Sequence, residues 1–403
     1  MNAFLTHPMA SLAGAAPLRE AQAAQGAGVA GRRLRAVAFG GGIGMFPPLM
    51  QRLREEFDVV ASLAPAEPRL ARLWFRLLSM RSTRHAWYRA WRHYMEKTPW
   101  AFDQQTRESA RLLAQVDGGY DVILFFGAMF APGRLGTTPL FVFTDSCRWL
   151  SSRNEHDEIS HFANAREEAA WLEREASVYR GAERVFVGSE FVRGAMVEHY
   201  DVDPARVVNS GLAAGPAFAE PYDKAFDGKT ILYIGKGDFE KKGGVILMRA
   251  FEQVRREIPD ARLEIVGQDR LPRAEGVVNH GFVRDRERIV SLMRAAHVFA
   301  LPSLVDRNPI SILEAMAAGT PCVASDYGAM PELVGDAGLI APCGDEKALA
   351  EALVRILRDA DLSRRLSDEG RRRYRERYNW DSVWDIVRGQ MRTALAQRGL
   401  HHG

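Results

Sequence analysis

Two carboxylates placed around the start of a helix constrain this chain more than any other feature. Asp306 and Glu314 are eight positions apart within residues 300–325, and Asn308 and Pro309 lie between them. Asn followed by Pro is typical of a helix N-cap and first turn. The start of a helix has unpaired N–H groups that bind anions such as phosphate. The pattern therefore predicts a phosphate site flanked by two hydroxyl-binding carboxylates, which is the layout that a sugar nucleotide requires.

This segment resembles the motif of a carboxylate, seven residues and a Glu in the family-four retaining glycosyltransferases, which have the GT-B fold. A Pro-Ser pair before the motif and a Gly-Thr-Pro run after it extend the resemblance. The resemblance implies that Asp306 binds the transferred sugar and that Glu314 binds the ribose. The family usually has Glu at the first position, so Asp306 is one methylene shorter. Donor contacts at the helix start are expected from Asn308, Pro309, Ile310 and Ser311. The alternative is a capped core helix with a buried or paired Glu314.

A basic loop follows the strand predicted at residues 230–234. It begins at Gly235 and contains Lys236, Lys241 and Lys242. Glycine permits close backbone approach, and ligands bind at the carboxyl ends of strands in open α/β sheets. The family has an Arg and a Lys here that neutralise the donor diphosphate. The resemblance puts Lys236 and Lys242 in these two catalytic roles, with Lys236 as a point charge because Lys lacks the fork of Arg. We interpret Lys241 as a solvated turn residue.

Residues 277–283 resemble the short strand and glycine turn that lie beside the nucleotide base in this family. Gly281, Phe282 and Val283 are expected to hold the base through backbone contacts and packing. No residue in this stretch identifies the base as uracil, guanine or adenine.

The N-terminal half offers two weaker candidates. Residues 40–44 are rich in glycine but lack the spacing of a dinucleotide-binding fingerprint. We interpret Gly41 and Gly42 as part of a loop that closes over the donor phosphates. Asp145 follows a predicted strand at residues 140–144. Two roles stay open for Asp145: accepting the acceptor proton or fixing the sugar, and capping the next turn.

Alternating apolar strands and amphipathic helices predict an α/β protein with parallel sheets covered on both faces. The resemblance implies the GT-B form of this class: two Rossmann-like, doubly wound domains facing a cleft, with a C-terminal helix crossing back to the first domain. The expected division is a disordered leader at residues 1–31, an N-terminal acceptor domain at 32–213, a nucleotide-sugar domain at 214–378 and the crossing helix at 379–403.

Strands are predicted at 34–39, 122–126, 140–144, 184–187, 230–234, 262–266, 297–301 and 321–324. Helices are predicted at 245–257, 286–295 and 347–357, and a small-residue linker at 211–221.

The composition is that of an ordinary globular protein, with 47% hydrophobic and 26% charged residues and a net charge of +3. Three cysteines without metal-like spacing favour a reducing compartment. Without a secretion signal or an apolar run long enough to span a bilayer, a cytoplasmic location is expected. Peripheral binding to the inner face of the cytoplasmic membrane is an extension of this expectation.

Residues 69–97 raise that possibility because they combine eight basic residues and one acidic residue with several aromatic ones. Such a face suits an anionic membrane or a lipid-diphosphate acceptor. A pair of core helices whose arginines reach into water is the favoured alternative. The composition also suits single-stranded nucleic acid, but the chain has no recognised nucleic-acid module, so no nucleic-acid partner is expected.

The expected function is that of a retaining glycosyltransferase, which transfers a sugar from a nucleoside diphosphate sugar to a hydroxyl acceptor. A lipid-linked acceptor is one of the options. Synthesis of bacterial-type polysaccharide, glycolipid or glycoconjugate is the expected setting. No cofactor and no metal are expected. A sugar-nucleotide epimerase of the same architecture and a non-catalytic sugar-nucleotide-binding protein are the alternatives, and an oxidoreductase ranks third.

Overall fold

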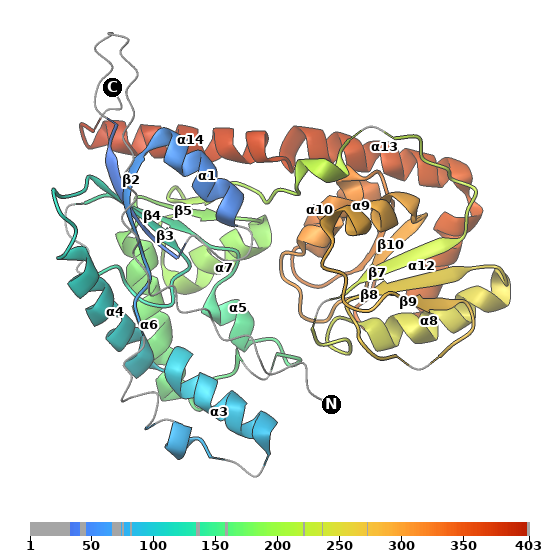
Figure 1. Ribbon diagram of the computed structural model, residues 1–403, viewed down its shortest axis with the longest axis horizontal. Coiled ribbons are helices and arrows are strands. Elements are labelled where there is room, and N and C mark those ends of the chain that lie inside the picture. The colour runs from blue at the N-terminus through green and yellow to red at the C-terminus, as the bar shows by residue number, and fades with distance from the viewer. Residues whose placement is uncertain are drawn as a thin grey trace, which may run out of the picture.

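Two parallel sheets, each covered by helices on both faces, organise the chain (Figure 1). The computed structural model describes residues 33–40, 46–66, 74, 76–80, 83–133, 138–157, 160–220, 222–235, 237–271 and 273–400. The predicted leader at 1–31 therefore lies outside the described residues. Within the described part of the chain, no helix combines the length and the apolar character that crossing a bilayer requires.

The first sheet has the strand order β2-β1-β3-β4-β5-β6, and all its strand pairs are parallel. Its strands are β1 (Arg35–Phe39), β2 (Asp58–Leu63), β3 (Val122–Phe126), β4 (Leu140–Phe143), β5 (Arg184–Val187) and β6 (Val207–Asn209). The helices of this half are α1 (Phe46–Glu56), α3 (Arg84–Glu96), α4 (Pro99–Leu113), α5 (Arg148–Ser152), α6 (Ala165–Gly181) and α7 (Glu190–Tyr200).

The second sheet has the order β12-β11-β10-β7-β8-β9 and is also parallel. Its strands are β7 (Thr230–Ile234), β8 (Arg262–Val266), β9 (Val277–Asn279), β10 (Val298–Leu301), β11 (Cys322–Ser325) and β12 (Gly338–Ala341). Around it lie α8 (Gly244–Glu257), α9 (Arg286–Ala295), α10 (Ile310–Ala317), α11 (Met330–Val334), α12 (Glu346–Arg358) and α13 (Ala360–Arg377). Two short 3₁₀ helices, η2 (Pro216–Phe218) and η3 (Gly335–Ala337), complete this half.

The central strands are buried on both faces, as their apolar runs predict. In β7, Leu232 packs in one core with helices α9 and α10, while Ile231 and Tyr233 pack on the other face with α8 and α12. The same alternation in β1 and β3 feeds two cores in the first sheet. Burial on both faces therefore holds the strands parallel and leaves their carboxyl ends free to carry a site.

The last helix, α14 (Trp380–Gln397), packs on the first sheet although it follows the second in sequence. Its Trp384 and Val387 share a core with α1 and with strands β1, β3 and β4. Helices α13 and α14 run along one side of the molecule, one over each half (Figure 1). The crossing helix that the resemblance implied is thus confirmed as part of a GT-B arrangement.

The chain passes between the halves twice, and the two passages touch. Ala214 in the outgoing passage donates its backbone N–H to the carbonyl of Tyr378 in the returning one at 3.1 Å. Phe218 in the outgoing passage is fully buried in the second half. The predicted domain boundaries at 213/214 and 378/379 stay a prediction, and Pro221 at the end of the expected linker lies outside the described residues.

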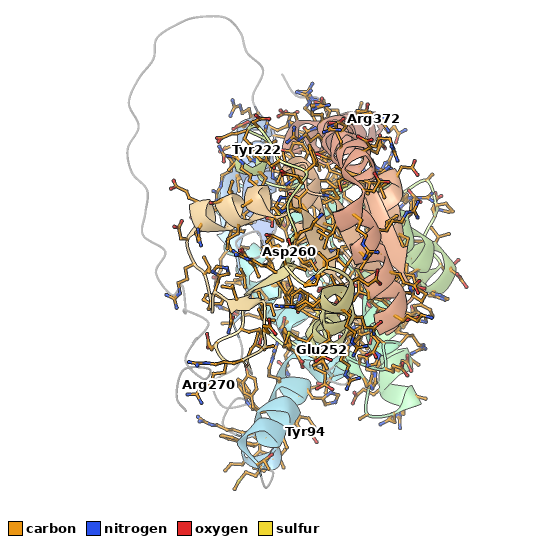
Figure 2. The ribbon with its side chains drawn as sticks, turned by 90° about the vertical axis from the view of Figure 1, so that its right-hand side faces the viewer. Tyr94, Tyr222, Glu252, Asp260, Arg270 and Arg372 are labelled. Carbon is orange, nitrogen blue, oxygen red and sulfur yellow. The ribbon has the colours of Figure 1, made fainter. Side chains whose placement is uncertain are left out.

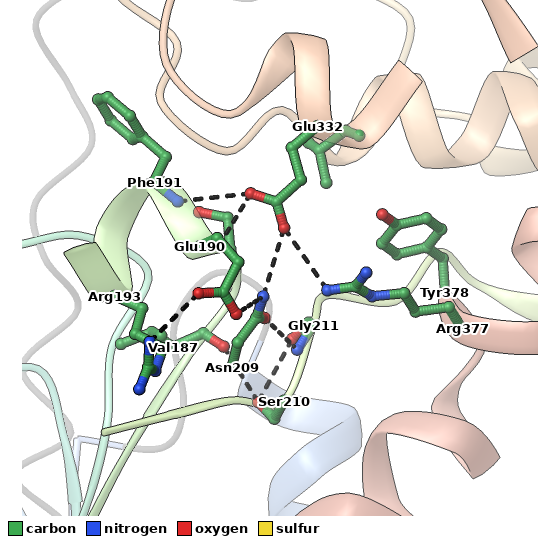
Figure 3. Close-up of polar contacts among 12 residues, drawn as sticks. Val187, Glu190, Phe191, Arg193, Asn209, Ser210, Gly211, Glu332, Arg377 and Tyr378 are labelled. Carbon is green, nitrogen blue, oxygen red and sulfur yellow. Dashed lines mark hydrogen bonds and ion pairs between the residues drawn. The ribbon is translucent and has the colours of Figure 1, made fainter. Parts of the chain in front are cut away.

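Beside these passages, Glu332 of α11 joins the two halves (Figure 3). Its carboxylate accepts the backbone N–H of Glu190, the first residue of α7, at 2.8 Å. The same carboxylate accepts from Asn209 Nδ2 at 3.3 Å and lies 3.5 Å from Arg377. A carboxylate at a helix N-terminus is favourable because it accepts hydrogen bonds from unpaired N–H groups and lies at the positive end of the helix dipole.

The observed elements differ from the predicted ones at the sheet edges and at some strand and helix ends. The edge strands β2, β6 and β12 were not predicted, because each is short or only partly buried and carries a weak apolar signal. Predicted strands 34–39 and 140–144 each lose one end residue, and the strand predicted at 297–301 begins at Val298. The strand predicted at 321–324 lies at Cys322–Ser325 instead. The helix predicted at 286–295 matches α9, whereas α8 begins one residue before the predicted 245–257 and α12 extends one residue beyond each end of the predicted 347–357.

A buried glutamate fixes the turn after β4. Glu175 of α6 accepts hydrogen bonds from the hydroxyls of Tyr200 at 2.6 Å and Tyr179 at 2.8 Å. It also accepts the backbone N–H of Arg148, the first residue of α5, at 3.1 Å. Burial raises the pKa of Glu175 to about 7, and the two tyrosine hydroxyls oppose the rise. A group with a raised folded-state pKa stabilises the fold at low pH and loses that contribution as the pH rises through the folded pKa.

We therefore expect Glu175→Gln to flatten the pH dependence of stability. Between the ordinary value of 4.5 and about 7, the folded chain binds more protons than the unfolded one. The wild type should consequently lose stability, relative to the variant, by on the order of 3 kcal/mol as the pH rises across this window. Urea unfolding at a series of pH values measures the difference. Glu173→Gln, on the exposed face of the same helix, is the control, and parallel curves for all three proteins would contradict the prediction.

Candidate active site at the carboxyl ends of strands β7 and β10

The loops that follow β7 and β10 lie against each other because these strands are neighbours in the sheet. Leu304 after β10 donates its backbone N–H to the carbonyl of Lys241 after β7 at 2.9 Å. Gly243 makes this approach possible. A Cβ added at Gly243 would lie 1.8 Å from the carbonyl oxygen of Pro302, and its φ of +73° favours glycine. Gly243 therefore serves close packing between two strand ends.

An ion pair joins the two loops through their side chains. Lys242 Nζ lies 2.9 Å from both carboxylate oxygens of Asp306. Ser303 orients the acidic loop, since its hydroxyl accepts the backbone N–H of Asp306 at 3.1 Å. An ammonium has three N–H groups, and two of them are used here. In the described part of the chain no protein acceptor is recorded for the third, which leaves it for a ligand.

Glu314 of α10 forms a second pair with the first residue of α9. Arg286 Nη2 donates to Glu314 Oε1 at 2.6 Å, and the guanidinium also lies 4.5 Å from the centre of the Phe218 ring. Burial raises the pKa of Glu314, while the charge and hydrogen bond of Arg286 lower it. The Arg286 side chain is 56% exposed, so it can move toward a ligand at little cost. The Glu314 carboxylate is thus held in place and neutralised by an exposed partner.

The start of α10 differs from the prediction. Pro309, not Asn308, is the N-cap, and the helix begins at Ile310. Asn308 instead donates from Nδ2 to the backbone carbonyl of Asp145 at 2.5 Å, across the two halves of the molecule. The predicted cap was wrong because Asn308 finds a carbonyl of another strand end, which no local sequence pattern reveals.

Two helix N-termini flank the Lys242–Asp306 pair. Helix α8 begins at Gly244, two residues after Lys242, and α10 begins at Ile310, four residues after Asp306. As far as the described residues show, no side chain caps either start. Both therefore present unpaired N–H groups and the positive ends of their dipoles on the side where the lysine lies. This arrangement suits a phosphate-bearing ligand.

The comparisons with known proteins agree with this geometry. Residues 228–359 match the family model of glycosyl transferases group 1. This stretch contains both ion pairs and both helix starts. Over these residues the chain is similar to the group 1 glycosyl transferases.

Whole-chain comparisons extend the likeness to the fold. The structure of sucrose-phosphate synthase from Thermosynechococcus elongatus aligns with a TM-score of 0.65 at 17% identity, covering 91% of this chain and all of the other. Anabaena HepE, solved in complex with UDP, aligns with a TM-score of 0.60 at 15% identity, covering 90% of this chain and 100% of its own. The predicted GT-B fold is therefore confirmed.

A curated relative is the phosphatidyl-myo-inositol mannosyltransferase of Mycobacterium leprae. It is 38% identical over 167 residues, which are 39% of this chain and 44% of the relative. The chain spans less than half the length of the first curated relatives it matches. This likeness therefore covers one part of the molecule.

In the second half of the molecule, the remaining predicted donor contacts lie along the same sheet edge. Gly235 directly follows β7, and its carbonyl accepts from Gln268 Nε2 at 2.7 Å. Gly281 follows β9 with φ of +66°, and Val283 packs against the core. Phe282 is exposed, with the Arg284 guanidinium 5.9 Å from its ring centre. The roles of these residues, and of Pro309, Ile310 and Ser311, stay predictions.

Some predicted site residues are not brought into contact with the ion pairs or cannot be placed. Asp145 has an exposed side chain, and among the described residues only its backbone carbonyl is recorded in contact with the second half. Lys236, Gly41 and Gly42 lie outside the described residues. Within the described ranges, no three His, Cys, Asp or Glu side chains come together as a metal site.

Sequence reasoning missed three features of the site. Arg286, the partner of Glu314, lies in a run of charged residues in which nothing distinguishes it. Asn154 donates to the carbonyl of Leu304 at 2.8 Å, and Arg307 lies 3.7 Å from Asp157. The first half of the molecule therefore contacts the loop that follows β10 and carries Asp306. These partners are distant in sequence, and only the fold brings them together.

A cavity of about 640 Å³ lies between α9 and the segment that precedes β7. Arg286, Arg294 and Lys224 are among its lining residues, but Lys242, Asp306 and Glu314 are not. We therefore assign the site from the paired charges and strand ends rather than from this cavity, which reaches the site only through Arg286.

The packing of the two loops predicts unequal effects for two glycine substitutions. Gly237→Ala and Gly243→Ala both place a side chain at positive φ, which should cost roughly 1 kcal/mol of stability. A Cβ at Gly237 meets no atom within 4 Å, whereas one at Gly243 overlaps Pro302. Gly243→Ala should therefore lose a further 1–3 kcal/mol, about the cost of overpacking. Chemical denaturation of both variants tests this, and equal losses would show that the loops separate easily.

Proposed function

We propose that this chain is a retaining glycosyltransferase, which moves a sugar from a nucleoside diphosphate sugar to a hydroxyl acceptor. The observation that carries the proposal is the Lys242–Asp306 pair between two helix starts at adjacent strand ends. The match of residues 228–359 to the group 1 glycosyl transferases supports it. So does the likeness of fold to HepE, a protein solved in complex with UDP.

In this proposal the negative charge of the donor diphosphate is added to a site whose own charged side chains are already paired. Each anionic side chain of the site already has a cationic partner, Lys242 for Asp306 and Arg286 for Glu314. A diphosphate brings extra negative charge, which is met by the third N–H of Lys242 and by the starts of α8 and α10. Glu314 accepts hydrogen bonds from the ribose hydroxyls once Arg286 has turned toward solvent or phosphate.

The proposed reaction involves only atoms of the donor and the acceptor: one bond breaks, one forms and one proton is transferred. The bond between the anomeric carbon and the phosphate oxygen breaks, and the electron pair leaves with the nucleoside diphosphate. The acceptor oxygen bonds to the same face of the anomeric carbon, so the configuration is retained. The acceptor proton passes to the departing phosphate oxygen. Lys242 and the helix starts stabilise the negative charge that grows on this group, so the proposal includes no metal ion or other cofactor.

The family resemblance implied that Asp306 binds the transferred sugar. Its carboxylate pairs with Lys242 in the structure, and we propose that it contacts the transferred sugar when the diphosphate draws the ammonium away. Asp145 lies at the first-domain strand end that contacts this loop through Asn308. We assign it the acceptor side of the reaction.

The names of the curated relatives support a proposal for the acceptor class. The Mycobacterium leprae protein is named for mannosyl transfer to phosphatidyl-myo-inositol. We propose by analogy that this chain acts on a hydroxyl of a polyol-bearing glycolipid and takes a hexose from its donor.

Product analysis with and without an acceptor tests the activity. Thermal shift with uridine, guanosine and adenosine diphosphates first selects the base. GDP-mannose or the matching nucleotide sugar is then incubated with detergent-dispersed phosphatidylinositol. We expect a glycosylated lipid whose anomeric configuration, read by NMR, equals that of the donor. Inverted configuration would contradict retention, conversion of the donor without acceptor would identify an epimerase, and binding without consumption would identify a sensor.

Two adjacent lysines provide a matched test of the leaving-group role. Lys242→Ala should lower kcat about 10²–10³-fold while weakening donor binding much less, because the diphosphate charge grows in the transition state. Lys241 has nearly the same exposure but lies 3.9 Å from Asp238 instead, so Lys241→Ala should change little.

Lys242→Ala also leaves Asp306 without its partner, so Lys242→Ala/Asp306→Asn separates this effect from loss of the phosphate contact. Steady-state kinetics and donor titration measure all three variants. Similar losses for both single variants would remove Lys242 from the reaction.

A further inference from the structure

Exposed apolar side chains gather in one part of the first half of the molecule. The described residues include twelve large hydrophobic side chains that are exposed, and six of them lie between residues 74 and 100. They are Trp74, Leu77, Leu78, Met80, Tyr88 and Trp100. Single exposed apolar residues are normal on a protein surface, but a cluster of this kind marks an interaction site.

The most exposed members belong to a short segment before α3, which we call the apolar segment (residues 74 and 76–80). Trp74, Leu77 and Met80 are 62–66% exposed. Trp87 of α3 holds the segment in place, because its Nε1 donates to the carbonyl of Arg76 at 2.9 Å. The Arg76 guanidinium also lies 5.2 Å from the centre of the Trp87 ring. The segment is therefore attached to a helix with its apolar side chains outward, unlike the pair of core helices that sequence reasoning favoured.

The charge around the apolar segment is strongly one-sided. Residues 69–97 contain eight Lys or Arg and one Glu, a formal charge of +7 with histidine neutral. The whole chain carries only +3, so the remaining residues together are net acidic. An anionic surface would attract this part of the molecule and repel the rest. Charge thus both strengthens and orients the contact.

The position of α3 makes the face accessible. Helix α3 lies on the opposite side of the first half from α14 and projects beyond the body of the molecule (Figure 1). The view turned by 90° shows the same projection, with Tyr94 on the protruding helix (Figure 2). A flat partner can therefore reach α3 and the apolar segment without meeting α13 or α14.

We propose that α3 and the apolar segment dock on a bilayer that contains anionic lipid. Leu77, Leu78 and Met80 enter the boundary between headgroups and acyl chains, while arginines of the same stretch meet lipid phosphates. Tryptophan and tyrosine favour the same boundary because their rings are amphipathic. Docking is independent of sugar transfer, so either proposal can fail alone. If both hold, docking brings the protein to its lipid acceptor.

Vesicle flotation of the full chain, without donor or acceptor, tests the docking. Vesicles of phosphatidylcholine alone are compared with vesicles of equal parts phosphatidylcholine and phosphatidylglycerol. We expect binding at least about tenfold stronger to the anionic vesicles, with most of it lost as the salt rises from about 0.05 M to 0.5 M. Equal binding to both kinds of vesicle, or no flotation on anionic vesicles at low salt, would overturn the proposal.

Two sets of variants separate the apolar and the charged contributions. Leu77→Ser/Leu78→Ser should weaken flotation about tenfold or more, whereas Ile386→Ser, an exposed apolar position on α14, should not. Arg84→Gln/Arg89→Gln/Arg92→Gln should remove most of the salt-sensitive binding. Arg355→Gln/Arg365→Gln/Arg375→Gln, three exposed arginines of α12 and α13, is its control. Loss of binding in the control variants to the same degree would overturn the assignment to this face.

A second copy of the chain is the competing occupant. Analytical ultracentrifugation without vesicles distinguishes it. A dimer that Leu77→Ser/Leu78→Ser converts to monomer, together with no flotation, would assign the face to self-association and overturn the membrane proposal. Circular dichroism confirms that each variant is folded, which is expected because the substituted leucines are half or more exposed.

Discussion

One ion pair between neighbouring strand ends determines the arrangement of the site. Lys242 and Asp306 come from loops that follow β7 and β10, and their side chains meet because those strands are adjacent and parallel. The pair needs the close loop packing that Gly243 allows and the backbone orientation that Ser303 supplies. It lies between the starts of α8 and α10, where the proposed donor would place its negative charge. Removing it would leave two charged side chains without partners beside the sheet edge, which is costly where water is partly excluded.

The sequence predicted the centre of each sheet well and the edges poorly, for a physical reason. Central strands such as Val122–Phe126 and Thr230–Ile234 are buried on both faces, so their apolar runs are continuous and their predicted bounds were correct. Edge strands such as β2 and β12 keep one side in water and read as mixed polar segments. The GT-B arrangement itself came from resemblance rather than from these patterns.

For the site, spacing within one segment was informative and contacts between segments were not. Asp306 and Glu314 were found because both lie beside one helix start. Their partners were harder to predict: Lys242 was proposed as a phosphate ligand and is seen paired with Asp306, and Arg286 was not singled out at all. Asn308 shows the limit most clearly, since its local pattern predicted a cap and a distant carbonyl displaced that role.

The two chain passages between the halves also restrict how those halves can move. Because Ala214 is hydrogen-bonded to Tyr378, the outgoing and returning segments lie together and act as a single hinge rather than two separate tethers. A rotation that separates the strand ends would break the hydrogen bond from Asn308 to the carbonyl of Asp145 and the one from Asn154 to the carbonyl of Leu304. Glu332 lies beside Arg377 and accepts the backbone N–H of Glu190 at the start of α7. Relative motion of the two halves is therefore opposed both at the chain passages and at the strand ends.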